Sequence, residues 1–182
     1  FPIDYRPGSI DQKSLNDGIE EDLIRLEKIT HRFEMIGRDP DLTVLNIVDV
    51  LEDLREYLYK RMPRLSQGIE LSVEIPEVGT SIRGNKILLS WALENVVKNA
   101  LDAMAGRTGE IRVEAVRDSS KWLRITVQDT GPGVDPKVRD KIFEAGISGK
   151  EAGWGVGLTL ARRIIVGSHN GRIYLGPDQS EG

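Results

Sequence analysis

The apolar residues between positions 85 and 105 recur at helical spacing and predict a helix with two unlike sides. At about 100° per residue, one side collects the apolar residues Leu89, Leu93, Val96, Val97, Ala100, Leu101 and Met104. Asn95, Asn99 and Asp102 collect on the opposite side. A merely solvated side would more often carry Glu and Lys, because Asn and Asp form helices less readily. The oxygens of these three side chains suit Mg²⁺ or the water around a phosphate, and an ordinary polar helix face is the alternative.

Residues 1–43 predict an appendage ahead of the main domain. Residues 1–14 contain two prolines and few apolar positions, so we expect them to be irregular. We expect a helix over 15–36, where a narrow apolar stripe keeps close to heptad spacing. Its members are Leu15, Ile19, Leu23, Leu26 and Phe33. Such a stripe favours pairing with other helices, although an amphipathic helix on the domain surface would show a similar pattern.

After Gly37–Pro40 the chain alternates between helical and strand patterns. We expect helices over 45–60, 136–144 and 159–166, the first of them ended by Pro63 and Gly68. We expect strands over 69–75, 80–83, 110–116, 122–128 and 172–175, and a loop over 145–153. The strands on either side of 117–120 each have one apolar face and predict a hairpin. A sheet with one apolar face needs helices on that face only. The predicted fold class is therefore α/β of the α+β kind: a two-layer sandwich of a mixed β-sheet with helices packed on one face, preceded by one long helix.

Two glycine-rich stretches carry candidate nucleotide chemistry. In Asp129-Thr130-Gly131-Pro132-Gly133-Val134, a carboxylate stands at a strand end before a glycine turn. The carboxylate can accept a hydrogen bond from an exocyclic amine, and the glycines let the backbone approach a flat ring. Gly153-Trp154-Gly155-Val156-Gly157-Leu158 opens a helix, where free backbone N–H groups can hold phosphate oxygens. The stretch before it is not one continuous strand, so the dinucleotide-binding interpretation of these glycines fails.

The order of these motifs resembles that of a GHKL-type ATP-binding domain and, within that superfamily, the catalytic domain of sensor histidine kinases. The resemblance covers roughly residues 44–175 and lies in four motifs. They are Glu94–Ala100 (the N box), Asp129–Val134 (the G1 box), Lys141–Glu144 (the F box) and Gly153–Leu158 (the G2 box). Four motifs in the right order make a chance match improbable.

The resemblance implies ATP and Mg²⁺ as cofactors and assigns roles to residues. Asn99 resembles the Mg²⁺ ligand, Asn95 its neighbour in the phosphate region, and Asp129 the residue that binds the adenine amino group; Asn95 and Asn99 are the candidate catalytic pair. The nucleotide-binding residues are expected to be Asn95, Asn99, Asp102, Asp129, Gly131, Gly133, Val134, Lys150, Gly153, Gly155, Val156, Gly157, Leu158 and Thr159.

The implied activity is transfer of the γ-phosphate of Mg-ATP to a histidine on a dimerisation helix, for signalling through a response regulator. Residues 1–43 then contain a helix resembling the second helix of the dimerisation hairpin, and 44–182 the catalytic domain, with its usual last strand missing. The implied partners are the receiver domain of a response regulator and the protein's own dimerisation and phosphoacceptor domain, in a full-length homodimer.

Neither histidine is expected to accept the phosphoryl group. His31 is followed by Arg32 rather than an acidic residue, with no proline before Pro40, unlike the acceptor motif that the family resemblance implies. His169 stands in a Ser-His-Asn-Gly turn, where a capping or turn role is the better interpretation. The acceptor helix is therefore expected upstream of Phe1, in a longer protein of which this chain is a fragment.

At positions 95 and 102 this chain carries residue types that differ from those of other GHKL proteins. Hydrolysing GHKL proteins resemble one another in carrying Glu four residues before the Mg²⁺ ligand, where it acts as a general base; here that residue is Asn95. Many family members place a basic residue where this chain has Asp102, so Lys98 or Lys150 is a candidate replacement, with a solvated loop lysine as the alternative for Lys150.

The rival functions are a chaperone-type or mismatch-repair-type GHKL ATPase, an anti-sigma-type serine kinase, and a module that binds partners without catalysis.

The composition narrows the remaining possibilities. With 25 Lys+Arg against 29 Asp+Glu, the net charge of −4 gives no reason to expect nucleic-acid binding. The absence of cysteine excludes disulfides and thiolate metal sites. The sequence contains no run of about 18 apolar residues, so we expect neither a membrane span nor a membrane contact from this fragment. We expect a cytoplasmic domain, in a full-length protein that a membrane segment elsewhere could anchor.

Overall fold

The computed structural model describes residues 40–65, 68–75, 80–119, 121–147 and 155–176, and before them positions 19, 23, 30 and 34, which are helical. The chain divides into two compact units, Phe1–Arg38 and Asp39–Gly182. The remainder of the helix predicted over 15–36, including His31, lies outside the described residues. No described helix has both the length and the apolar content needed to cross a membrane.

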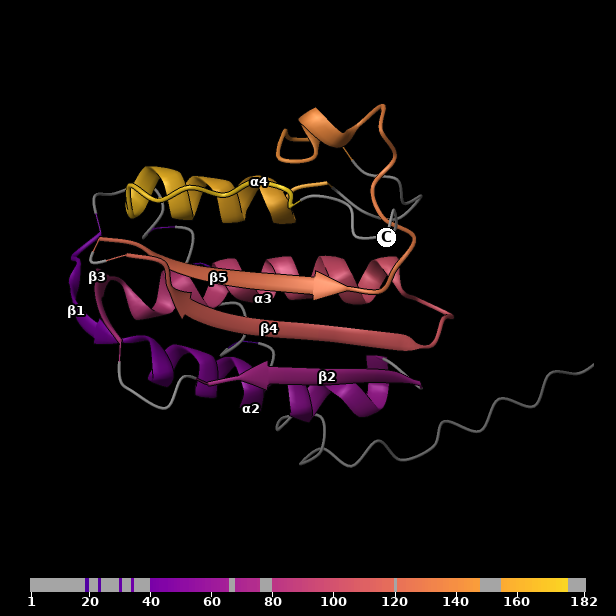
Figure 1. Cartoon of the computed structure of the whole chain (residues 1–182), viewed down its shortest axis with the longest axis horizontal. Helices are drawn as coiled ribbons and strands as arrows, with labels where there is room; N and C mark the ends of the chain where they lie inside the picture. Colours follow the sequence, from indigo (N-terminus) through magenta and orange to yellow (C-terminus); the bar gives the residue numbers. More distant parts are fainter. Residues whose placement is uncertain are drawn as a thin grey trace, which may run out of the picture. The chain divides into compact units, whose positions relative to one another are not determined.

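A three-stranded mixed sheet forms one layer of the second unit (Figure 1). Its order is β2 (Ile69–Glu74), β4 (Gly109–Arg117), β5 (Leu123–Asp129), with β2 parallel and β5 antiparallel to β4. The alternation predicted for β4 is confirmed, since Ile111 and Val113 are buried and Arg112 between them is exposed. The mixed sheet follows the prediction.

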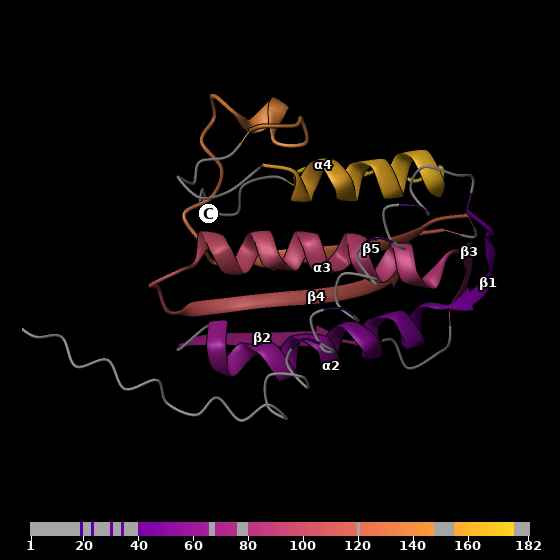
Figure 2. The ribbon, with the colours of Figure 1, turned by 180° about the vertical axis from the view of Figure 1, so that it is seen from behind.

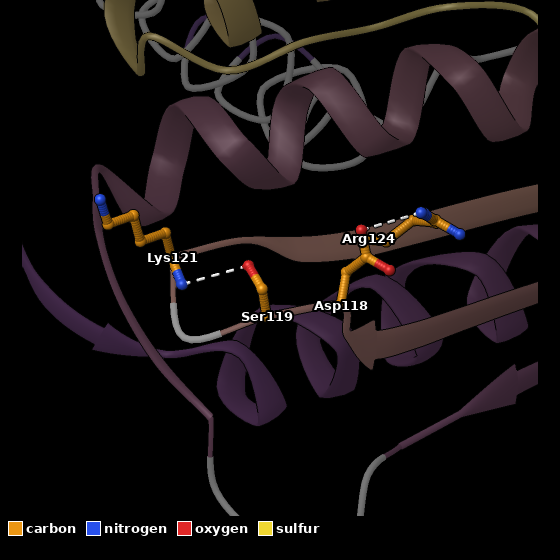
Figure 3. Close-up of polar contacts among 4 residues, drawn as sticks. All are labelled: Asp118, Ser119, Lys121 and Arg124. Carbon is orange, nitrogen blue, oxygen red and sulfur yellow. Dashed lines mark hydrogen bonds and ion pairs between the residues drawn. The ribbon is translucent and has the colours of Figure 1, made fainter.

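The turn between β4 and β5 is closed by backbone and side-chain bonds. The backbone N–H of Asp118 donates to the carbonyl of Trp122 at 3.0 Å. Arg124 pairs with the Asp118 carboxylate at 2.9 Å, and the backbone N–H of Lys121 donates to Ser119 Oγ at 3.3 Å (Figure 3). These contacts fix the register of the hairpin that the sequence predicted.

Two helices, α2 (Ile47–Leu65) and α3 (Lys86–Ala103), lie on the same face of this sheet (Figure 2). The buried core between the layers consists of Ile47, Val50, Leu51, Leu54, Leu58, Ile69, Leu89, Leu93, Val97, Ala100, Leu101, Met104, Ile111, Val113 and Ala115. Val96, predicted for this core, is only half-buried and lies outside it. Lys86 Nζ pairs with Asp53 at 2.8 Å between the helices, and this hydrogen bond raises the pKa of Lys86 against a smaller opposing effect of desolvation.

The strand β1 (Thr43–Asn46) was not predicted. It pairs antiparallel with β3 (Ser81–Gly84) as a separate two-stranded sheet, and Leu45 packs against the main core. The predicted helix over 45–60 was therefore wrong at its start, because Leu45 and Asn46 pair with a strand about forty residues away that helical spacing cannot reveal. It was also wrong at its end, since α2 continues through Pro63 to Leu65.

The last third of the chain differs from prediction in three places. The helix expected over 159–166 begins at Gly157 as α4 (Gly157–Arg162) and continues as the π-helical η2 (Arg163–Ser168). Residues 136–144 form turns around the short 3₁₀ helix η1 (Arg139–Lys141), with Asp135 Oδ1 accepting from the Lys137 N–H at 2.8 Å. Residues 172–175 are not a strand, since no backbone ladder is assigned to them, and Arg172 lies 4.8 Å over the Trp122 ring.

Candidate functional site

The helix α3 has a second packed face besides its core face. Leu88 and Ala92 are 0% and 1% exposed but lie outside the main core, and α3 is in contact with α4, so we infer that α4 covers this side. On α4 and η2, Ala161 and Ile164 are likewise fully buried outside that core. At about 100° per residue, Leu88 and Ala92 lie within about 60° of Asn95. The face that α4 covers thus continues along α3 as the polar face of Asn95, Asn99 and Asp102.

Asn95 lies at the point on α3 where α4 begins. Its Nδ2 donates to the Trp91 carbonyl at 2.8 Å, which fixes the orientation of the amide. A Cβ added at Gly157 would lie 3.2 Å from Asn95 Oδ1, so the N box and the G2 box touch at this point. Glycine at 157 therefore lets α4 start beside the amide oxygen without pushing it aside.

Asn99 and its neighbours are open to solvent. Asn99 is exposed and makes no side-chain hydrogen bond within the described residues. Lys98 Nζ pairs with Asp102 Oδ2 at 2.8 Å, one turn apart on the same helix. No cluster of three or more His, Cys, Asp or Glu residues suited to a metal occurs in the described part of the chain. An Mg²⁺ ion on Asn99 would therefore need phosphate and water oxygens to complete its shell, which is how Mg²⁺ is commonly held.

Asp129 ends β5 and is held by the turn that follows it. Its Oδ1 accepts a hydrogen bond from the Gly131 N–H at 2.9 Å, and a Cβ on Gly131 would lie 2.5 Å from that oxygen. The structure gives Asp129 Oδ2 no partner among the described residues. Gly133 adopts φ 74°, a value that favours glycine, and Val134 is half-buried. One carboxylate oxygen is thus positioned by the backbone and the other can accept a hydrogen bond from a ligand.

Met104 packs against the G1 turn at Gly131, a role that the sequence did not predict. The side chain is fully buried, and its Cγ would lie 3.3 Å from a Cβ on Gly131. A Cβ on Gly109 would clash with both Met104 and Thr130, whose Oγ1 accepts from the Glu110 N–H at 2.9 Å. No local signal in the sequence pointed to this packing.

The second glycine motif is described from Gly155 onward. Gly155 has φ 59°, and a Cβ there would lie 2.8 Å from the Ile147 carbonyl oxygen. Val156 is exposed, Leu158 is half-buried, and the Thr159 hydroxyl is buried without a hydrogen-bond partner among the described residues. A buried unpartnered hydroxyl two residues after Gly157 fits a site that a polar ligand completes. Gly153 and Lys150 lie outside the described residues.

His169 lies at the other end of α4 and η2 and takes the turn role that the sequence favoured. Its Nδ1 is 2.9 Å from the Ile164 carbonyl, and its Nε2 accepts the Asn85 N–H at 3.0 Å. These two bonds assign the proton to Nδ1. Asn85 in turn caps α3, with Oδ1 accepting from the Leu88 N–H at 3.1 Å. His169 thus ties the end of η2 to the start of α3.

The fold and these contacts define an ATP-binding domain of the GHKL type, in which one helix meets a glycine motif at each of two points. Residues 84–182, more than half of the chain, match the histidine kinase-, DNA gyrase B- and HSP90-like ATPase family, and the chain belongs to this family. Membership supports the use of ATP.

Individual relatives are sensor kinases. The chain is 27% identical over 190 residues to the adaptive-response sensory kinase SasA of Prochlorococcus marinus, covering 96% of this chain and 48% of that protein. It is 30% identical over 180 residues to the sensory histidine kinase/phosphatase NtrB of Rhodobacter capsulatus, covering 87% of this chain and 47% of that protein. The chain thus spans about half the length of these curated relatives.

Solved structures show the same fold. The catalytic domain of the histidine kinase ThkA matches with a TM-score of 0.64 at 23% identity, over 73% of this chain and 85% of that one. ThkA in complex with the response regulator protein TrrA matches with a TM-score of 0.64 at 22% identity, over 96% of this chain and 50% of that one.

Proposed function

We propose that this chain is the ATP-binding catalytic part of a sensor histidine kinase, which transfers the γ-phosphate of Mg-ATP to a histidine on a dimerisation helix. The observation that carries the proposal is the double use of α3. The helix approaches the G2 glycine Gly157 at Asn95, and its C-cap residue Met104 packs against the G1 glycine Gly131. Asn95 and Met104 are nine positions apart, which is about 13 Å along a helix axis. That span suits an extended adenosine triphosphate, with its base at Asp129 and its phosphates near Asn95.

The residue roles follow from this placement. Asp129 Oδ2 accepts a hydrogen bond from the adenine amino group, while Gly131, Gly133 and Val134 line the base. Asn95, Asn99 and the Thr159 hydroxyl take the phosphate end. Asn99 holds Mg²⁺, which when bound would supply charge neutralisation for the transferring phosphoryl group. The residues contribute mainly by positioning the phosphates, as phosphoryl transfer requires.

Asn95 favours transfer to a side chain over hydrolysis. Its amide cannot accept a proton as a carboxylate would, and its Nδ2 is already engaged with the Trp91 carbonyl. Water beside the phosphates therefore lacks a general base at this position. The sensor-kinase names of the relatives support the same choice over a hydrolysing machine or a serine kinase.

The partners follow from the same proposal. A response regulator is the expected receiver of the phosphoryl group, supported by the complex of ThkA with its response regulator TrrA. The helix predicted over 15–36 would belong to the dimerisation hairpin of a homodimer, with the catalytic domain over 44–182. The proposed compartment is the cytoplasm.

Binding and labelling test the proposal together. The chain should bind ATP and ADP in calorimetry, and should release phosphate from ATP at close to the background rate. With γ-labelled ATP it should not label itself, but should transfer acid-labile, base-stable label to a dimerisation hairpin carrying an acceptor histidine, supplied from the full-length protein. Failure to bind ATP, or acid-stable label on serine, would contradict it. Acid-labile label on His31 would place the acceptor in this chain.

A further inference from the structure

An exposed ion pair borders the polar face of α3. Lys98 Nζ lies 2.8 Å from Asp102 Oδ2, with the two side chains 70% and 35% exposed. At about 100° per residue, Lys98 projects about 60° from Asn95, and Asp102 about 20° from it. Both charged groups therefore stand beside the amide pair Asn95 and Asn99.

This face of α3 needs a positively charged group if it is to bind a polyphosphate. Asp102 alone would repel the phosphates, because its carboxylate lies on the same stripe as Asn99. The basic residues of α3 are Lys86 and Lys98, and Lys86 lies about 180° from Asn95 and pairs with Asp53 on α2. Lys98 is thus the cation on this face of α3.

We propose that Lys98 binds the nucleotide phosphates in this chain and that Asp102 holds its ammonium on the helix until nucleotide arrives. This inference rests on the proposed function. An exposed ion pair is weak, because water and salt screen it. The long, flexible lysine stem lets the ammonium exchange one carboxylate for the higher charge of a polyphosphate.

The exchange makes the site sensitive to the number of phosphates. Lys98 is one turn from Asn95, whereas Asp129 lies beyond the far end of α3, so Lys98 can reach the phosphates but not the base. Its contribution should be largest for ATP, smaller for ADP and absent for adenosine. Asp102 competes for the same ammonium and therefore lowers the affinity for ATP.

The test is nucleotide affinity in variants of the ion pair, measured by calorimetry or competition against a fluorescent ATP analogue. Lys98→Met should weaken ATP by about tenfold, ADP by less and adenosine not at all, while Lys98→Arg keeps the affinity. Asp102→Asn should strengthen ATP by about two- to threefold, because Lys98 no longer leaves a carboxylate. The parent affinity should fall with salt more steeply than that of Lys98→Met.

The chain offers a matched control on α2. Lys60 Nζ pairs with Glu56 Oε1 at 2.6 Å, four residues apart and exposed like the Lys98 pair. Lys60→Met makes the same charge change away from the polar face and should leave ATP affinity unaltered. Thermal unfolding of each variant shows whether folding is intact.

Three results would overturn the inference. They are unchanged ATP affinity in Lys98→Met, an equal loss for adenosine, and an equal loss in Lys60→Met. Each of these leaves the proposed function standing, provided that the parent binds ATP. A parent chain that binds no ATP would instead refute the proposed function and this inference with it.

Discussion

Replacing Asp129 by Asn changes one atom of the side chain that we place against adenine. In the structure Asp129 Oδ1 accepts the Gly131 N–H at 2.9 Å, and the amide oxygen of Asn can keep that bond. The new NH₂ group must then occupy the position of Oδ2. A donor would face the adenine amino group, which is itself a donor, in place of an acceptor.

The magnitude follows from the bonds that change. The variant loses one hydrogen bond to a charged acceptor and leaves two donors opposed, which together cost about 2–4 kcal/mol of binding free energy. At 1.4 kcal/mol per factor of ten, the dissociation constant for ATP should rise about thirty- to thousandfold. The free energy of unfolding without nucleotide should change by less than about 0.5 kcal/mol, because Asp129 is exposed and the turn bond survives.

The assay is calorimetric titration with ATP and with GTP, alongside urea unfolding. Asp135→Asn is the matched control, since Asp135 Oδ1 accepts the Lys137 N–H at 2.8 Å in the same kind of two-residue turn. It should change ATP affinity by less than about twofold. A change below about threefold in Asp129→Asn would refute the adenine assignment, and so would an equal loss in both variants.

Other residues give further expectations. Asn99→Ala removes an oxygen that we assign to Mg²⁺, so it should weaken Mg-ATP much more than metal-free ADP, and equal losses for both in calorimetry would remove that assignment. Asn95→Ala should leave ATP hydrolysis near background and Asn95→Glu should raise it; phosphate release by the parent at about 1 s⁻¹ or more, abolished in Asn95→Ala, would mean a hydrolase. His169→Phe leaves the Asn85 N–H and the Ile164 carbonyl unpaired and should cost about 1–3 kcal/mol in urea unfolding; a loss within the error of the method would show that the tie is dispensable.

The sequence predicted those parts of the fold whose pattern is local. The hairpin of β4 and β5 alternates residue by residue, and the polar face of α3 repeats at helical spacing, so both could be predicted. The strand β1 could not, because Val44 and Leu45 suit a helix or a strand until β3 is placed beside them. Arg172–Leu175 has strand-like residues, yet only a partner strand would make it one.

The candidate site shows the same limit. The glycine motifs and Asn95 could be identified from residue type alone. The burial of Leu88 and Ala92 under α4 could not, because it depends on the position of a helix about seventy residues later in the chain. The support that Met104 gives to Gly131 also joins residues far apart in the sequence, and the apolar Met104 side chain was identified only as core.

The crowding around α3 limits how this protein can change in evolution. Leu93 and Val97 are committed to the main core, Ala92 to α4, and Asn95 to the close approach of Gly157. Substitutions at any of these positions disturb a neighbour that is already in contact. The exposed edge at Lys98 is free of that constraint. New charge, and with it new preference among phosphorylated ligands, can therefore be acquired there by single substitutions that leave the packing of the helix unaltered.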